Sequence, residues 1–222
     1  ISAYRPGVIV DPYLGNAPLW SLSYEIFFYA IFPICLRLFS RRQRDTRMFI
    51  QIVSATGVLT YLLLPNHFSL IVGYFAIWWF GAMLAFAMEK ANITLRFLKI
   101  EFIGNISVIM IWLLGIAHFG SRGLGLFPVL NLRHFLFCIS VGALVTTRHL
   151  WAPATSRLIR TLSFLAPVSR FSYGIYILHY PLLVQTGAGR SLFMVPMMAV
   201  TVVAAYFADV TLSKWLPRAP KT

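Results

Sequence analysis

Long apolar runs separated by short polar gaps dominate the pattern of this chain. Seven runs are within or close to the length that a tilted transmembrane helix needs, and they lie near residues 19–38, 48–64, 68–88, 102–119, 126–147, 163–186 and 191–212. The sixth run has Pro167 and Arg170 near its start, so residues 163–170 are alternatively an interfacial segment that precedes the span. The pattern predicts an all-α fold: a polytopic transmembrane helix bundle of about seven spans, forming one membrane domain over 1–222 with an outer loop at 1–18.

Composition supports a membrane protein and narrows its class. Hydrophobic residues make up 59% of the 222 positions and charged residues only 11%, which is too apolar for an average soluble domain. The net charge of +13 does not indicate a nucleic-acid partner, because the basic residues cluster in the gaps between apolar runs. Cys35 and Cys138 fall inside apolar runs without disulfide or metal-ligand spacing, so we expect packing residues and no metal site.

The placement of the basic residues predicts how the chain is oriented. Fourteen of the nineteen lysines and arginines lie on one set of alternate segments, at 37–47, 89–101, 148–160 and 213–222. The opposite gaps hold only three arginines. By the positive-inside rule, this asymmetry places residue 1 outside, the C-terminus in the cytoplasm, and Glu25 in the outer part of the first span.

The first span carries an acid about 9 Å inside it at helical rise. A carboxylate is costly in hydrocarbon, so Glu25 is a candidate functional residue. Ser21, Glu25 and Tyr29 recur every four residues and share one helix face, and Trp20 stands where an interface anchor is expected. Glu25 is a plausible proton acceptor or donor; alternatively, it ties helices together through Arg133 or a hydroxyl.

A second polar stripe lies within residues 171–183. Ser172, Tyr176 and His179 follow an i, i+4, i+7 spacing on one helix face. The imidazole there could move protons or bind a polar head group. Pro181 predicts a kink, which tends to open a polar pocket beside it. The alternative for His179 is a hydrogen-bonded core residue.

Arg133 and His134 form a third candidate site, about 11 Å into the fifth span. Asn131 and Cys138 share the helix face of His134. A buried arginine needs a partner or an anionic ligand, and Arg133 would then be the counter-ion of Glu25. Alternatively, the helix starts later and both residues lie at the membrane interface.

The sequence does not match the motifs that are typical of soluble enzymes. The sequence has no Gly-rich phosphate loop, nucleophile elbow, metal-ligand cluster or Walker pattern. Asp209, near the predicted cytoplasmic end of the last span, is expected to have a structural role at the interface. The residues alone predict an outward-facing polar pocket in a helix bundle, which suits a transporter as well as a transferase.

Two segments resemble motifs of the acyltransferase 3 family. Residues 20–33 closely resemble its W-S-L-S-x-E-x-x-F-Y-x-x-F-P segment, and residues 172–181 resemble its late S-Y-x-I-Y-x-x-H-x-P segment. The two occur in order and about 150 residues apart, which makes the resemblance specific. Two positions depart from the family: Ile26 follows Glu25 where members often carry a second acid, and Asp209 stands near the place of a closing glutamate.

The resemblance implies a membrane enzyme that O-acylates sugars of surface or secreted bacterial glycans, with acyl-coenzyme A as donor and no bound cofactor. The family usually has ten helices with both termini cytoplasmic. Its last seven would begin outside and end inside, in agreement with the charge count. The resemblance further implies that the family's catalytic histidine and an arginine pair precede Ile1, so that residues 1–222 are expected to be inactive alone.

We therefore expect an acetyl group to pass from cytoplasmic acetyl-coenzyme A to a sugar hydroxyl of an exopolysaccharide, O-antigen or related glycan at the cytoplasmic membrane. Glu25 and His179 are the predicted catalytic residues: Glu25 would orient a partner group or accept its proton, and His179 would line the acyl or acceptor path with Tyr176. The predicted substrate-binding residues are Trp20, Ser21, Tyr29, Arg133, Ser172 and Tyr176. The predicted partners are the lipid bilayer, acyl-coenzyme A and the glycan, without nucleic acid. A glycan or lipid-linked sugar transporter is the alternative, and a seven-helix receptor has only the span count in its favour.

Overall fold

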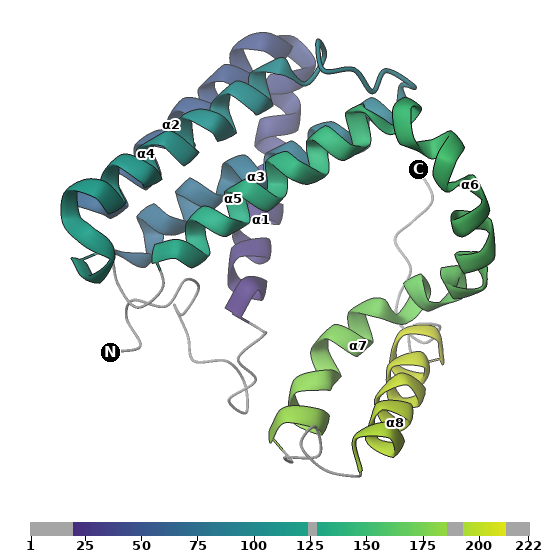
Figure 1. Cartoon of the computed structure of the whole chain (residues 1–222). Helices are drawn as coiled ribbons and strands as arrows, with labels where there is room; N and C mark the ends of the chain where they lie inside the picture. The colour runs from purple at the N-terminus through teal and green to yellow at the C-terminus, as the bar shows by residue number, and fades with distance from the viewer. Residues whose placement is uncertain (1–19, 124–127, 186–192, 212–222) are drawn as a thin grey trace. The chain divides into compact units, whose positions relative to one another are not determined.

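The computed structural model describes residues 20–123, 128–185 and 193–211, and every regular element within them is helical (Figure 1). This confirms the predicted all-α fold. The predicted outer loop at 1–18 lies outside the described residues. The chain divides into two compact units, and the boundary falls inside α6 (Arg148–Leu162), between Ala152 and Pro153.

Unit 1, as described, covers residues 20–123 and 128–152. Its helices are α1 (Trp20–Arg41), α2 (Gln43–Leu63), α3 (His67–Glu89), α4 (Lys99–Gly123) and α5 (Pro128–Thr146), followed by the first residues of α6. α2 packs against both α3 and α4, α4 packs against α5, and α1 contacts α2 and α3 (Figure 1). Short connections between successive helices make α2, α3 and α4 antiparallel neighbours.

Unit 2, as described, covers residues 153–185 and 193–211. After α6, a 3-10 segment (Ser163–Phe171) leads into α7 (Ser172–His179), which widens into a π-helical turn (Tyr180–Gln185). α8 (Met194–Tyr206) continues into a second π-helical turn (Phe207–Thr211) and packs beside α7. The predicted kink at Pro181 is thus a change of helix type that begins next to His179.

The helices follow the predicted apolar runs closely, whereas the number of spans stays a prediction. By length and composition, four of the described helical segments could cross a membrane: Gln43–Leu63, His67–Glu89, Lys99–Gly120 and Met194–Thr211. The pair Asn131–Thr146 and Arg148–Ser156, bent by 73°, would count as a fifth. The apolar helix Gly174–Leu183 is shorter than a span needs.

Two predicted gaps are helical instead of irregular. Only Arg42 separates α1 from α2, so most of the segment 37–47 belongs to helices. The segment 148–160 lies in α6, which carries polar and basic residues among its apolar ones. Basic residues in a short connection between apolar runs therefore do not end a helix by themselves, because arginine and lysine have good helix propensity.

α2 turns polar residues inward and apolar residues outward. Arg47, Gln51 and Ser54 are buried, while Phe49 is 60% exposed and Leu63 is 62% exposed. In water such a helix would expose apolar surface without compensation, whereas in a bilayer the same surface contacts acyl chains. The arrangement fits a membrane helix whose polar stripe faces the protein interior.

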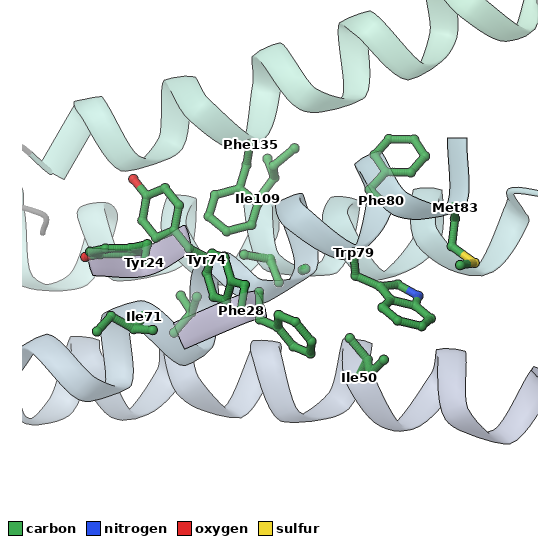
Figure 2. Packing of buried hydrophobic residues seen from close by; sticks show 14 of the residues in the cluster. Tyr24, Phe28, Ile50, Ile71, Tyr74, Trp79, Phe80, Met83, Ile109 and Phe135 are labelled. Atoms are coloured by element: carbon green, nitrogen blue, oxygen red, sulfur yellow. The ribbon is translucent and has the colours of Figure 1, made fainter. Parts of the chain in front are cut away.

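The core of unit 1 is rich in buried aromatic side chains. Trp79 and Phe80 of α3, Trp112 of α4 and Phe135 of α5 are fully buried, and Figure 2 shows several of these side chains packed between the helices. α2 and α3 approach closely at Gly57, where an added Cβ would lie 2.8 Å from the backbone nitrogen of Gly73. Small residues at such a crossing let helices pack without large side chains between them.

Candidate functional site

Glu25 lies in the second turn of α1 with a partly exposed side chain. Because α1 is continuous, Ser21, Glu25 and Tyr29 share one helix face, as predicted. Among the described residues, no ion pair or hydrogen bond engages the Glu25 carboxylate. The side chains of Trp20 and Ser21 lie outside the described residues. The alternative role for Glu25, tying helices together, has no contact to support it in the described part of the chain.

The aromatic residues that follow Glu25 attach α1 to α3. Phe28, Tyr29 and Phe32 surround the indole of Trp78 with ring centroids 5.8, 5.9 and 5.2 Å away, respectively. Such aromatic contacts contribute beyond the apolar area that they bury. Tyr29 remains 59% exposed, so its ring has a packing contact while most of its surface is accessible. These contacts of the second half of segment 20–33 therefore fix α1, the helix that carries Glu25, against α3.

A hydrogen-bonded group of three residues, the Tyr74 cluster, joins α3 to α5. The Tyr74 hydroxyl donates to Oδ1 of Asn131 at 2.8 Å and lies 2.7 Å from Nδ1 of His134. With the hydroxyl proton directed at Asn131, Nδ1–H of His134 donates to the tyrosine oxygen, and Nε2 carries the lone pair. The ring of Tyr24 from α1 lies edge-on against Tyr74 at 5.5 Å. The residue before Glu25 thus contacts this cluster directly.

Arg133 does not have the predicted counter-ion role. The prediction required a buried arginine, but Arg133 is exposed on α5, and no ion pair joins it to Glu25 among the described residues. α5 begins at Pro128, and its buried face is formed by Asn131 with Phe135, so the neighbouring position 133 points away from the helix contacts. Near position 133, the polar residue that α5 contributes to the interior is Asn131.

The second stripe is helical, and its histidine is oriented by the backbone. α7 spans Ser172–His179, which confirms that Ser172, Tyr176 and His179 share one face. Nδ1 of His179 lies 2.7 Å from the carbonyl oxygen of Tyr176. Carbonyl oxygens only accept, so Nδ1 carries the proton and Nε2 of the neutral imidazole is the acceptor. His179 is partly exposed, and a substrate group could reach that nitrogen.

Asp209 makes a structural contact at the start of α7, while its predicted place at the membrane interface stays a prediction. Its carboxylate oxygen Oδ2 accepts a hydrogen bond of 2.7 Å from the backbone N–H of Gly174. That N–H lies in the first helical turn, where no carbonyl of the helix can accept it. An added Cβ at Gly174 would lie 3.0 Å from Ala205 and from Asp209, so the glycine allows the two helices to approach.

A buried ion pair that the sequence pattern did not predict joins α2 to α4. Nε of Arg47 donates to Oε1 of Glu101 at 2.7 Å, Nη2 donates to Oε2, and the two side chains are 7% and 0% exposed. Nη2 also donates to the carbonyl oxygen of Phe97, whose ring centroid lies 4.8 Å from the guanidinium carbon. Bidentate geometry and the extra acceptor offset part of the cost of burying both charges.

A groove of about 750 Å³ lies beside this pair, between α2 and α4. Its mouth is basic, with Arg44, Arg96 and Lys99 exposed, and we call it the basic groove. Its walls are apolar and include Met48, Ile52 and Ile103. The volume is typical of a small-molecule site.

The basic groove also contains a buried amide. Gln51 lines the groove and is 6% exposed, and neither of its amide atoms has a hydrogen-bond partner. The side chain lies against Gly104, where an added Cβ would be 2.2 Å from Oε1 of Gln51. A buried amide without partners is costly, so this position calls for a polar group from outside the protein.

A comparison with protein families decides what kind of protein carries these features. The family model of the acyltransferase domain, acyltransferase 3, matches residues 3–215. The chain belongs to the acyltransferase 3 family. The match covers both resembling segments and confirms the family predicted from them. Searches of curated proteins and of solved structures each gave no match.

Membership makes the chain a membrane acyltransferase in general terms, and its apolar helices make it a multi-pass protein. The predicted residues of this acyltransferase fall into two groups. Glu25 and Tyr29 lie in unit 1 with the Tyr74 cluster, while Ser172, Tyr176 and His179 lie in unit 2. Each group is brought together within its own unit.

The residues of the ion pair and the groove have a detectable signal in the sequence. Arg47, Gln51 and Ser54 recur at i, i+4 and i+7 in an otherwise apolar helix, and Glu101 and Asn105 are four apart at the start of another. A count of loop charges takes Arg47 for a solvent-exposed residue. One apolar run carries a polar stripe with a basic residue, Arg47, and another carries a stripe with an acidic residue, Glu101. These two stripes together would have predicted the Arg47–Glu101 ion pair.

Proposed function

We propose that this acyltransferase transfers an acetyl group from acetyl-coenzyme A to a sugar hydroxyl of an exopolysaccharide, O-antigen or related glycan. The observation that carries the proposal is the family match over residues 3–215, which contains both segments with candidate proton-transfer residues. Acyl transfer from a thioester to a hydroxyl needs a base for the hydroxyl proton and an enclosed path for the acyl group.

Glu25 has the chemistry for the first of these needs. Its carboxylate is partly exposed and has no partner among the described residues, so a substrate or partner group can approach it. The aromatic contacts of Phe28, Tyr29 and Phe32 with Trp78 fix the helix that carries it. A base on a well-packed helix keeps its position relative to the reacting hydroxyl.

In this proposal, His179 lines the path of the acyl group. The hydrogen bond from its Nδ1 to the Tyr176 carbonyl leaves Nε2 as an acceptor on the exposed side of α7. Tyr176, 37% exposed and 6.1 Å away between ring centroids, lines the same face. The pair is suited to contact the acyl or sugar group. We further propose that the chain lies in the cytoplasmic membrane with its C-terminus inside, which the distribution of its basic residues supports.

The experiment is to express the intact protein in its own cell and measure acetyl groups on the surface glycan by mass spectrometry. Glu25→Gln keeps the size of the side chain and removes its basicity, so we expect acetylation to fall by roughly 100-fold or more while the protein still enters the membrane. Glu89→Gln is the matched control, since Glu89 is an exposed acid at the end of α3 in the same unit. Unchanged acetylation in Glu25→Gln contradicts the assigned role.

Loss of the whole gene tests the reaction itself. The proposal predicts a glycan that reaches the surface without acetyl groups. A glycan that stays inside the cell with unaltered chemistry contradicts acyl transfer and indicates transport.

A further inference from the structure

We infer that the basic groove between α2 and α4 holds the coenzyme A part of the acyl donor, an inference that rests on the proposed function. The groove combines an exposed cationic mouth, an apolar wall and one buried amide without partners. Coenzyme A combines phosphate groups, at its diphosphate and ribose, with a pantetheine arm that contains amides and apolar carbons. Each part of the groove meets the corresponding part of this molecule.

The charge at the mouth suits phosphate. Arg44, Arg96 and Lys99 are exposed and have no ion-pair partner among the described residues. Arg47 also lines the groove, but Glu101 neutralises it, so the three exposed cations supply the net positive charge. Arginine and lysine at such a mouth bind phosphate oxygens through charge-assisted hydrogen bonds.

Gln51 distinguishes coenzyme A from a phospholipid. Both of its amide atoms lack a partner, so the groove presents a donor and an acceptor together. A pantetheine amide offers an acceptor and a donor in return, whereas the ester groups of a phospholipid only accept and its donors, where it has any, belong to the head group. Gly104 leaves room for this amide, because any larger residue there would occupy the space of the Gln51 side chain.

The location of the groove agrees with a donor that comes from the cytoplasm. Its cations belong to the segments 37–47 and 89–101, which the positive-inside rule places on the cytoplasmic side. Coenzyme A thioesters are charged and do not cross a bilayer, so their site must open to that side. The apolar wall formed by Met48, Ile52 and Ile103 then leads from the mouth along the helices.

The test is to measure binding by titration calorimetry with the intact protein in nanodiscs of neutral phosphatidylcholine. The probes are coenzyme A and adenosine 3',5'-bisphosphate, which keeps phosphates but lacks the pantetheine arm. The triple variant Arg44→Gln/Arg96→Gln/Lys99→Gln should weaken binding of both probes by roughly tenfold or more. Gln51→Leu should weaken coenzyme A by several-fold and leave the bisphosphate unchanged.

The control removes the same charge from a neighbouring surface. Arg37→Gln/Arg41→Gln/Arg42→Gln changes three exposed arginines that do not line the groove, and it should bind both probes as the unaltered protein does. Equal loss in both triple variants overturns the inference in favour of general charge attraction. Unchanged coenzyme A binding in the groove variant, with loss of co-purified anionic lipid, overturns it in favour of a lipid site.

Binding and reaction are separable in this design. If coenzyme A binds through the groove but the glycan carries no acetyl groups, the proposed function fails and the groove assignment stands. If the glycan is acetylated but the groove variants bind coenzyme A as tightly as the unaltered protein, the groove assignment is wrong and the proposed function stands.

Discussion

The two polar regions of unit 1 satisfy their buried groups in different ways. The Tyr74 cluster joins three neutral side chains through short hydrogen bonds at 2.7 and 2.8 Å. The Arg47–Glu101 pair instead buries two full charges beside an open groove and an amide without partners. Along α3, the distance from Tyr74 to the helix end at Glu89 is roughly 22 Å at helical rise, so the two regions lie toward opposite ends of the unit.

The difference separates a closed region from an open one. In the Tyr74 cluster, the tyrosine hydroxyl links both of its partners, and the residues connect α3 and α5 next to the helix that carries Glu25. Near the ion pair, Glu101 neutralises Arg47 while three cations and Gln51 remain for a ligand. Polar groups that complete one another stabilise the fold, whereas Gln51 lacks partners where it lines an open groove and can therefore bind a ligand.

The largest effect is expected from breaking the ion pair. Glu101→Ala leaves the guanidinium of Arg47 buried without its counter-charge, which should cost about 3–5 kcal/mol in free energy of unfolding. Replacing both residues, in Arg47→Met/Glu101→Met, should recover most of that loss, because neither charge is then buried alone. The free energy of unfolding of both variants is measured in mixed micelles, by titration with a denaturing detergent.

The matched control for this experiment is Glu89→Ala, which removes an exposed acid from the same unit. Its effect should stay within about 0.5 kcal/mol. An equal effect of Glu101→Ala and Glu89→Ala would show that the pair does not support the fold.

A smaller effect is expected at the other region. Tyr74→Phe removes one hydroxyl and leaves Oδ1 of Asn131, a residue 1% exposed, without its donor. The cost should be about 1–3 kcal/mol, since the group is buried but neutral. Tyr206→Phe is the control, because Tyr206 is 51% exposed. If the two variants unfold at the same denaturant concentration, the cluster is not a stabilising network.

The hydrophobic pattern alone was enough to locate the helices, because long apolar runs of this kind form few structures other than helices. The runs near 48–64, 68–88 and 102–119 correspond to α2, α3 and α4 within a few residues of the predicted ends. The sixth run is harder to predict, because Pro167 and Pro181 allow several helix types and the observed 3-10, α and π segments depend on tertiary contacts such as Gly174 with Asp209.

The candidate site was predictable only where its residues share one helix. The stripes at Glu25 and at His179 follow from helical spacing, which the sequence contains directly. The Arg47–Glu101 pair joins residues 54 positions apart, and its formation depends on how α2 and α4 pack. For the same reason, the pairing of Arg133 with Glu25 could not be judged from spacing, and the face that α5 buries carries Asn131 instead.

The most direct test of the central claim uses sealed membrane vesicles of defined orientation that contain the intact protein and the glycan acceptor. Radiolabelled acetyl-coenzyme A is added outside the vesicles, and label on the glycan is counted. Acetylation should occur in inside-out vesicles, where the basic groove meets the added donor, and be at background in sealed right-side-out vesicles. Equal acetylation in both orientations, or none in either, would contradict transfer from a cytoplasmic donor to an external glycan.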